Sequence, residues 1–261
     1  MPRVRQRTSR RSEILRVFTE MVAEHGYDNT AIGDIARELN ISKGTVVHHF
    51  GSKDSMLAEV EVAYMRRRLT EARIILEALG SPIEQLAGLI YSFVLVHRDD
   101  RPATIVVGRE YVRFVAEDSM ADVRALRDEY TSLVRQVIGR GMASGAFREE
   151  NAGLVTLQIF GMCNWAWTWL RPGGRSSAEE VAATFIRTLL SGIAIDGSLP
   201  SGVGNPKGAA ARVAREAMLT ARGADGAGVV PTQRSDATGA RVRNRRPRER
   251  PPAVDPEAPR R

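Results

Sequence analysis

The stretch Thr30–Lys53, TAIGDIARELNISKGTVVHHFGSK, carries the signals of two short helices joined by a tight turn. Its first residue is a favourable N-cap, and apolar side chains then recur at helical spacing, which predicts a helix over 31–39. Asn40 tolerates the left-handed conformation at which helices end, and Ser42 can cap a second helix immediately afterwards. The spacing therefore predicts a helix-turn-helix motif over 31–50.

The second helix of the motif turns a polar face outward. Val46 and Phe50 are four residues apart and face the first helix. In this motif the other face enters the major groove of DNA, where lysine, threonine and histidine can bond to bases or phosphates. Ser52 can cap a third helix whose amides point at the DNA backbone. The predicted DNA-binding residues are Thr30, Ser42, Lys43, Gly44, Thr45, Val47, His48, His49 and Lys53.

A further helix is predicted over 10–25, ended by His25 and Gly26. Its apolar face consists of Ile14, Val17, Phe18, Met21 and Val22. Two short helices with a tight turn, taken alone, equally suit helical proteins that never bind DNA. The preceding helix gives the motif a partner to pack on, so a three-helix DNA-binding domain is predicted over 10–53.

These residues resemble the TetR family of bacterial transcriptional regulators over residues 9–69. The matching residues are Gly26-Tyr27-Asp28, Thr30, Asp34-Ile35-Ala36, Ile41-Ser42-Lys43-Gly44-Thr45, His49-Phe50 and Ser52-Lys53-Asp54. The resemblance implies a dimeric repressor whose variable helical C-terminal domain binds a small molecule and releases DNA. The family usually has a tyrosine, whose hydroxyl contacts phosphate, where this chain has Val47. That contact is therefore expected from His48, His49 and Lys53.

The net charge of +7 is carried by the two ends of the chain. Residues 1–11 contain five arginines and no acidic residue, and residues 196–261 contain thirteen basic and seven acidic residues, which leaves the middle at −4. Basic arms attract DNA phosphates whatever the base sequence. We therefore predict a DNA-tracking basic arm over 1–9; a merely solvated basic segment is the alternative.

Residues 54–197 are predicted to form a six-helix ligand-binding and dimerisation domain, so the fold class is all-α. The expected starts are capped by Ser52, Ser81, Asp100, Ser119, Asn151 and Ser177, and the expected ends lie near Leu79, Arg98, Ala116, Ser144, Leu170 and Ile195. Residues 198–261 lack aromatic residues and are rich in Gly, Pro, Ala and Arg. They are predicted to be a disordered basic tail with at most a fragile helix near 208–222.

The sequence favours a cytoplasmic location without membrane contact. The single cysteine, Cys163, excludes an intramolecular disulfide and fits a reducing compartment. The uncharged run 154–170 is shorter than the roughly 20 residues of a membrane span and contains Gln158 and Asn164. No apolar core follows the N-terminal charges, so a signal peptide is not expected.

The last two predicted helices are the candidate dimer interface. Val181, Phe185, Leu189 and Gly192 form a stripe on the final helix, and the helix before it is apolar nearly all round. Two such helices from each subunit would form a four-helix bundle, and the homodimer would bind an inverted repeat on double-stranded DNA. The alternative is that both helices belong only to the intramolecular core.

A small-molecule pocket is predicted among the central helices, where large apolar side chains with polar tips gather. The candidates are Phe93, His97, Tyr111, Phe114, Tyr130, Phe160, Asn164 and Trp167. The segment Gly161–Gly174 resembles a stretch in TetR-type regulators of acyl-CoA catabolism. It implies an acyl-CoA effector with phosphates near Arg171 or Arg175. A free lipophilic compound is the alternative.

No catalytic constellation is visible in the sequence. The histidines are residues 25, 48, 49 and 97, and there is no metal-ligand cluster, GxSxG motif or phosphate-binding loop. We therefore expect no enzyme activity, no metal and no cofactor. A nonspecific architectural DNA-binding protein is the alternative function, because it would use the same basic arms.

Overall fold

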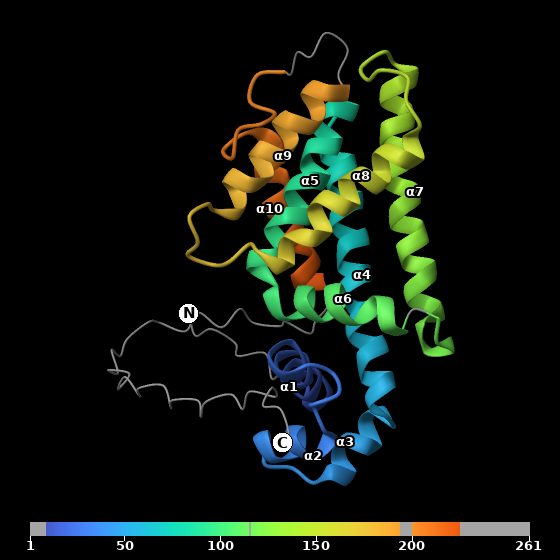
Figure 1. Cartoon of the computed structure of the whole chain (residues 1–261), viewed down its shortest axis with the longest axis vertical. Helices are drawn as coiled ribbons and strands as arrows, with labels where there is room; N and C mark the ends of the chain where they lie inside the picture. The colour runs from blue at the N-terminus through green and yellow to red at the C-terminus, as the bar shows by residue number, and fades with distance from the viewer. Residues whose placement is uncertain (1–8, 115, 194–199, 225–261) are drawn as a thin grey trace, which may run out of the picture. The chain divides into compact units, whose positions relative to one another are not determined.

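The computed structural model describes residues 9–114, 116–193 and 200–224, and every regular element in these ranges is a helix (Figure 1). In chain order they are α1 (Arg10–His25), α2 (Ile32–Glu38), α3 (Lys43–Phe50), α4 (Lys53–Ala78), α5 (Pro82–Asp99), α6 (Arg101–Phe114), the 3-10 helix η1 (Asp118–Met120), α7 (Ala121–Ala143), α8 (Ala152–Asn164), the 3-10 helix η2 (Trp165–Thr168), α9 (Ala178–Ile193) and α10 (Ala209–Ala224). The predicted all-α fold is confirmed.

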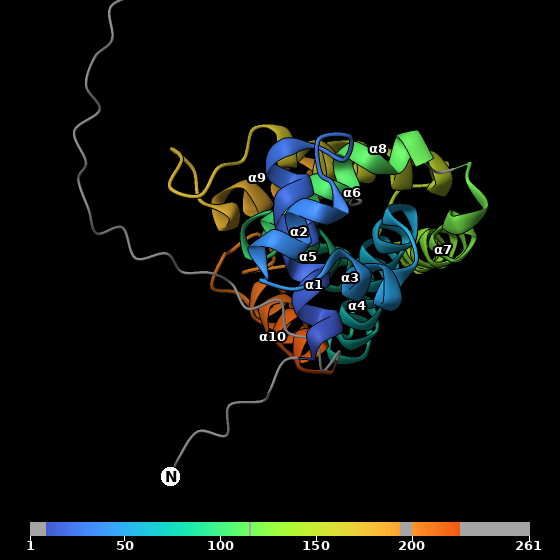
Figure 2. The same cartoon turned by 90° about the horizontal axis from the view of Figure 1, so that it is seen from below.

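The first three helices, α1–α3, form an N-terminal unit around a small apolar core (Figure 2). Its buried residues include Ile14, Phe18, Ile35 and Val46. Between α2 and α3 the chain turns at Asn40, whose φ is 52°, and the Ser42 hydroxyl accepts the Thr45 amide at 3.1 Å. Asn40 therefore ends α2 and Ser42 caps α3 as expected, and the helix-turn-helix is confirmed.

The prediction that Thr30 caps α2 is wrong. The helix begins at Ile32 with Ala31 at the N-cap position, and the Asp34 carboxylate accepts the Ala31 amide at 3.2 Å. The Thr30 hydroxyl instead donates to the Gly26 carbonyl at 2.9 Å, and its side chain is buried. Thr30 therefore closes the loop between α1 and α2 from the inside.

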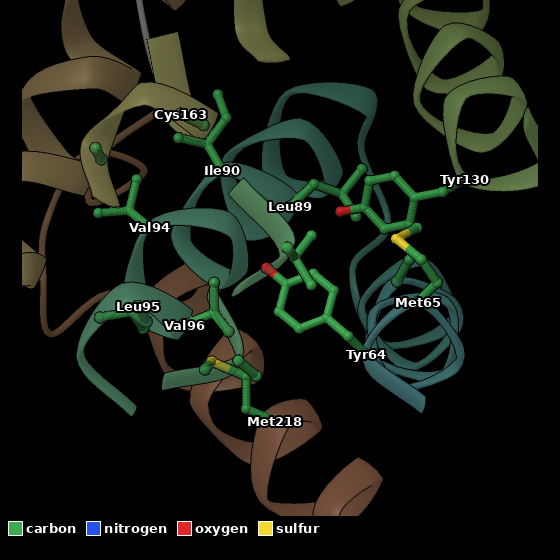
Figure 3. Packing of buried hydrophobic residues seen from close by; sticks show 14 of the residues in the cluster. Tyr64, Met65, Leu89, Ile90, Val94, Leu95, Val96, Tyr130, Cys163 and Met218 are labelled. Atoms are coloured by element: carbon green, nitrogen blue, oxygen red, sulfur yellow. The ribbon is translucent and has the colours of Figure 1, made fainter. Parts of the chain in front are cut away.

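Helix α4 joins the N-terminal unit to a C-terminal body made of α5–α10 (Figure 1). It packs on α1 and α3 at one side of this junction and on α5, α7 and α10 at the other. Helix α5 is the centre of the body, because α4, α7, α8, α9 and α10 all contact it. Accordingly, most residues of α5 are buried, including the polar Gln85, Ser92 and His97. Figure 3 shows its Leu89, Ile90, Val94, Leu95 and Val96 among Tyr64, Met65, Tyr130, Cys163 and Met218 of neighbouring helices.

Two predicted boundaries in the body are wrong. Ser119 does not cap a helix but lies within η1, and α7 begins at Ala121. The helix expected over 152–170 ends at Asn164 and continues as η2. In η2 the Trp167 ring packs so closely on α6 that a Cβ at Gly108 would lie 2.5 Å from its Nε1 atom. This close approach of the Trp167 ring favours glycine at position 108.

The helix allowed near 208–222 is present as α10, but it packs on the body, so the prediction of a disordered tail is wrong for residues 209–224. This helix packs along both α4 and α5 (Figure 2). Its inner face consists of Ala210, Ala211, Ala214, Ala217, Met218 and Ala221, all buried. Small side chains let neighbouring helices approach closely, so this face packs well although it contains little apolar area. The rest of the predicted tail, 225–261, and residues 1–8 of the predicted basic arm lie outside the described residues.

Candidate DNA-binding surface and ligand cavity

The solvent side of α3 and its N-terminus form the candidate DNA-binding surface. Exposed on it are Ser42, Lys43, Gly44, Val47 and His48, while Thr45 and His49 are half-buried. The helix has no acidic residue, and its first amides point outward at the N-terminus. Positive and neutral donors therefore cover a surface of the size and shape that a recognition helix presents to a groove.

Two of the predicted DNA-binding residues are engaged inside the N-terminal unit. Thr30 is buried, so its hydroxyl is not available at the surface. The Lys53 ammonium donates to the carbonyls of Tyr27 at 2.8 Å and Thr30 at 3.1 Å, and it lies 4.0 Å from the Tyr27 ring centroid. Lys53 therefore joins α4 to the loop before α2, and its predicted phosphate contact would come from the third ammonium proton.

Arg11 positions α3, a role that no local signal in the sequence reveals. Its guanidinium donates to the His49 carbonyl and the Glu59 carboxylate, and it stacks 4.3 Å from the Phe50 ring centroid. These contacts tie α1, α3 and α4 together at the C-terminal end of the recognition helix. The orientation of α3 is thus fixed by α4, the helix that continues into the body.

The C-terminal body contains a cavity of about 500 Å³ lined by residues of α4–α8 and η2. Of the predicted pocket residues, the lining includes Phe93, His97, Tyr111, Tyr130, Phe160, Asn164 and Trp167. The rings of Phe93, Tyr130 and Phe160 form a cluster, with centroids 5.4 to 6.1 Å apart. A mainly apolar cavity of this size is typical of a small-molecule site.

Three predicted pocket residues lie elsewhere. Phe114 packs edge-on against Tyr27, with ring centroids 4.8 Å apart, so it faces the N-terminal unit. Arg171 and Arg175 are exposed in the loop after η2 and are not part of the cavity lining. The lining continues past the end of α8 into η2 with Trp165 and Trp167, and the loop lies beyond it.

Two arginines that line the cavity were not predicted from the sequence. Arg127 of α7 stacks 3.6 Å from the Tyr111 ring centroid. Arg68 of α4 is buried and pairs with Glu71 at 2.5 Å. Because α4 is rich in charged residues throughout, its sequence looks like a solvated face, and only the packing distinguishes these buried charges from the exposed ones.

His97 lines the cavity in its neutral form. Its Nε2 atom lies 3.0 Å from the Cys163 carbonyl and must therefore donate to it. Burial lowers the His97 pKa from 6.5 to about 4, despite this hydrogen bond, which favours the protonated form. At neutral pH the Nδ1 atom consequently carries a lone pair rather than a proton.

Helix α6 connects the cavity wall with α1 and the loop that follows it. The Arg109 guanidinium donates to the Val22 carbonyl, and the Glu110 carboxylate accepts the Tyr27 amide at 3.4 Å. The next residue, Tyr111, lines the cavity. A ligand that moves α6 would therefore act directly on the C-terminal end of α1.

A buried carboxyl group lies at this junction. Glu61 of α4 is fully buried, and neither of its oxygens has a hydrogen-bond partner. Burial raises its pKa from 4.5 to about 8; the Arg127 charge opposes this shift and the Glu110 charge adds to it. Glu61 is thus protonated at neutral pH. Its pKa depends on the charge of Arg127, which lines the cavity.

The predicted apolar stripe of α9 faces inward within the chain. Val181 and Leu189 are buried, and α9 packs on α5. Phe185 is half-buried near Trp169, whereas Gly192 is exposed. Helix α5 therefore covers Val181 and Leu189, while Phe185 and Gly192 keep exposed surface, and the candidate dimer interface of the last two helices stays a prediction.

Helix α8 and η2, in contrast, expose large apolar residues. Leu154, Leu157 and Trp165 are 62 to 64% exposed and recur at helical spacing. Contiguous exposed apolar residues of this kind mark interaction surfaces.

Among the described residues, no helix is long and apolar enough to cross a membrane. The same part of the chain contains no group of three or more His, Cys, Asp or Glu residues arranged to hold a metal ion.

Comparison with known proteins identifies both parts of the chain. Residues 14–60 match the model of bacterial regulatory proteins of the tetR family, and residues 79–193 match that of the tetracyclin repressor-like C-terminal domain. The HTH-type transcriptional repressor KstR2 of Mycolicibacterium smegmatis is 29% identical over 191 residues, which are 72% of this chain and 92% of that protein.

Solved structures share the fold. The ketosteroid transcriptional regulator KstR2 of Mycobacterium tuberculosis aligns with a TM-score of 0.67 and 26% identity, over 72% of this chain and 96% of that one. AibR, in complex with isovaleryl coenzyme A and operator DNA, aligns with a TM-score of 0.63 and 21% identity, over 70% and 98%. With a helix-turn-helix that matches the family model and a C-terminal domain that matches its counterpart, this chain belongs to the TetR family of DNA-binding transcriptional regulators.

Proposed function

We propose that this protein is a homodimeric repressor that binds an inverted-repeat operator and is released from it by an acyl-CoA. The observation that carries the proposal is the cavity, because its α6 wall also holds the end of α1 through Arg109 and Glu110. A ligand can release DNA only by binding the released conformation more tightly than the DNA-bound one. Because α6 both lines the cavity and contacts α1, a ligand that shifts α6 can produce such a difference in affinity.

The exposed face of α8 supports a dimer. Leu154, Leu157 and Trp165 would be shielded from water in a two-fold interface, in which the same patch meets itself. A two-fold dimer presents two recognition helices, so each reads one half-site of an inverted repeat. Sedimentation of the full chain at micromolar concentration should show a dimer; a monomer would contradict this part of the proposal.

The cavity and the relatives support a hydrophobic effector with a CoA group. The lining provides room for an acyl chain among Phe93, Tyr130 and Phe160. Asn164 belongs both to this lining and to the exposed surface, and the loop that carries Arg171 and Arg175 follows it in the chain after η2. Those two arginines would bind phosphates outside the cavity while the acyl chain lies within it.

The test is release of the operator complex by acyl-CoAs and by the corresponding free acids. We expect release by the thioesters at lower concentration than by the acids. The double variant Arg171→Ala/Arg175→Ala should weaken release while operator affinity without ligand stays the same. Arg148→Ala, an exposed arginine in another loop, serves as the matched control. Equal release by acids and thioesters would disprove the CoA group, and release by neither would disprove the acyl class.

A further inference from the structure

The cavity lining contains two arginines and, among the described residues, no aspartate or glutamate. Its basic side chains are those of Arg68, His97 and Arg127. Arg68 is paired with Glu71, and burial lowers the pKa of His97 to about 4, so His97 is neutral. Arg127 of α7 is therefore the cation that gives this lining its net positive charge.

The guanidinium of Arg127 is held by stacking. It lies 3.6 Å from the Tyr111 ring centroid, and within residues 9–114, 116–193 and 200–224 no ion pair joins it to a carboxylate. The side chain is half-buried, and the buried polar atoms that lack a hydrogen-bond partner in these ranges include nitrogens of Arg68 but none of Arg127. Stacking uses the face of a guanidinium and leaves its edge for hydrogen bonds. The N–H groups of Arg127 are thus accessible to a ligand in the cavity.

Glu61 of α4 interacts with Arg127 but does not neutralise it. Glu61 is fully buried, and neither of its oxygens has a hydrogen-bond partner. The charged groups that act on it are Arg127 of α7 and Glu110 of α6, and burial outweighs both and raises its pKa to about 8. Glu110 is paired with Arg109 at 2.9 Å. At neutral pH, therefore, Glu61 carries a proton and Glu110 has a cation of its own.

A ligand that fills the cavity removes water from Arg127. A wholly apolar ligand would leave this cation poorly solvated, which is costly. A carboxylate would replace the lost water by charge-assisted hydrogen bonds in the fork geometry that guanidinium favours. Arg127 precedes Tyr130 by three residues, so the two side chains share one face of α7. A chain packed against the Tyr130 ring consequently extends toward Arg127.

We propose that the effector carries a carboxylate of its own and that Arg127 binds this group between α6 and α7. The inference rests on the proposed function only in placing the effector in this cavity. It concerns a second acidic group, because the phosphates of a CoA are proposed to lie at Arg171 and Arg175, outside the lining. In an acyl-CoA the carboxylate would stand at the far end of the acyl chain.

Two pairs of probes test the proposal. Decanoyl-CoA and the mono-CoA thioester of decanedioic acid differ only in a methyl or a carboxylate at the far end of the chain. Decanol and decanoic acid form a pair without CoA. Binding to the full-length protein at about pH 7.5 is followed by intrinsic fluorescence, because Trp165 and Trp167 line the cavity. We expect the decanedioic thioester to bind at least about tenfold more tightly than decanoyl-CoA, an order that an apolar lining alone would reverse.

The variant Arg127→Met should abolish this preference, because both thioesters then meet an uncharged lining. Arg135→Met is the matched control, since it removes an exposed arginine of the same helix outside the lining. Thermal melting shows whether each variant folds. If Arg127→Met does not fold, Arg127→Lys keeps the charge but loses the planar fork, and it should retain only part of the preference.

Glu61 provides a second readout, which a merely structural role of Arg127 would not change. Above pH 8 Glu61 loses its proton, competes for the charge of Arg127 and repels a carboxylate. Affinity for the decanedioic thioester should therefore be constant below pH 8 and fall above it, by at most about tenfold per pH unit. Glu61→Gln stays uncharged and should remove this fall. An equal fall in that variant would overturn the placement of the carboxylate beside Arg127.

The outcomes separate this inference from the proposed function. Equal or tighter binding of decanoyl-CoA by the unmodified protein would overturn the inference and leave the acyl-CoA proposal intact. If Arg127→Met weakens both thioesters without changing their ratio, Arg127 binds a phosphate of CoA and the inference is wrong. Arg127-dependent binding of decanoic acid that is tighter than that of decanol and of both thioesters would support the inference and overturn the CoA proposal. Binding of none of the four probes would overturn both.

Discussion

Among the described residues, the C-terminal body has buried ion pairs as well as exposed ones, whereas the ion pairs within the N-terminal unit are exposed. In the N-terminal unit the ion pairs Arg10–Glu13, Arg16–Glu20 and Arg37–Asp34 are one turn apart on helix surfaces and substantially exposed. In the body, Arg67–Asp100 and Arg68–Glu71 are at most 8% exposed. An exposed pair contributes about 0–1 kcal/mol, whereas removing one partner of a buried pair costs about 3–5 kcal/mol.

This difference assigns different tasks to the two regions. The DNA-binding surface keeps its polar groups in water, where they can exchange solvent for phosphates and bases at little cost to the fold. The body keeps charges in a cavity wall, where a ligand group or a proton changes their energy strongly. Electrostatic changes in the body should therefore alter stability, and those on α3 should alter affinity for DNA.

The largest expected effect comes from removing α10, which packs on α4 and α5. A chain truncated after residue 199 should lose more than about 3 kcal/mol of unfolding free energy, because the apolar faces of α4 and α5 would be exposed to water. Truncation after Ala224 removes no described contact and is the control. Denaturant unfolding of both chains measures the difference.

A point variant refines this test. Ala214 is fully buried in α10, and Leu219 of the same helix is 68% exposed. Ala214→Glu should destabilise strongly because it places a charge in the packed face, whereas Leu219→Glu should change little. Similar stability of the two variants would show that α10 does not pack on the body.

The second effect is a pH dependence caused by Glu61. Its pKa in the folded chain is about 8, above the ordinary value of 4.5, so the folded state binds the proton more tightly than the unfolded state. The contribution to stability is fully present below pH 4.5 and is lost as the pH rises through 8. Glu61→Gln has the shape of the acid but no charge, so it should remove this loss.

The expected gain of Glu61→Gln is on the order of 3 kcal/mol at pH 8.5 and near zero at pH 4.5. Denaturant unfolding at the two pH values measures it, with Glu59→Gln, whose partner Arg11 lies in the N-terminal unit, as a comparison on the same helix. A gain that is equal at both pH values would contradict a buried, titrating carboxyl group.

The N-terminal unit was largely predictable from sequence because its signals are local. Asn40 and Ser42 specify the turn through their own backbone and side-chain preferences, and the structure uses both. Thr30 was misassigned because a threonine next to a helix start can bond to the preceding loop as well as cap the helix. Lys53 and Arg11 act across elements, so their neighbours could not be read from spacing.

The cavity was only partly predictable because its chemistry depends on packing. Phe93, Tyr130 and Phe160 stand out by residue type and do line the cavity. In the run Arg66-Arg67-Arg68, the first residue is exposed and the other two are buried, a difference that helical periodicity allows but does not determine. Likewise, a helix near 208–222 was allowed from the sequence, but the packing of α10 on the body was not predicted, because an alanine-rich face does not look hydrophobic enough to pack.

The third effect concerns affinity for DNA rather than stability. Thr45→Ala or His48→Ala should weaken operator binding by roughly 1–3 kcal/mol if the residue contacts a base, and both variants should unfold like the original chain. Lys53→Met should differ from them, because its ammonium bonds to the Tyr27 and Thr30 carbonyls, and it should lower thermal stability as well. Unchanged operator affinity in all three variants would exclude α3 as the recognition helix.

The smallest effect is a gain of binding at Val47, which is 40% exposed on α3. Where the family resemblance implies a phosphate-contacting tyrosine, Val47→Tyr should restore a neutral hydroxyl donor and strengthen binding by about 0.5–1.5 kcal/mol. Because this donor carries no charge, it displaces no counterion, so the slope of affinity against salt concentration should stay unchanged. Val47→Phe adds the ring without the hydroxyl and separates packing from hydrogen bonding. Titrations of the operator at several salt concentrations measure both quantities. An equal gain for tyrosine and phenylalanine would mean that position 47 contacts an apolar group of the DNA, such as a thymine methyl, rather than a phosphate.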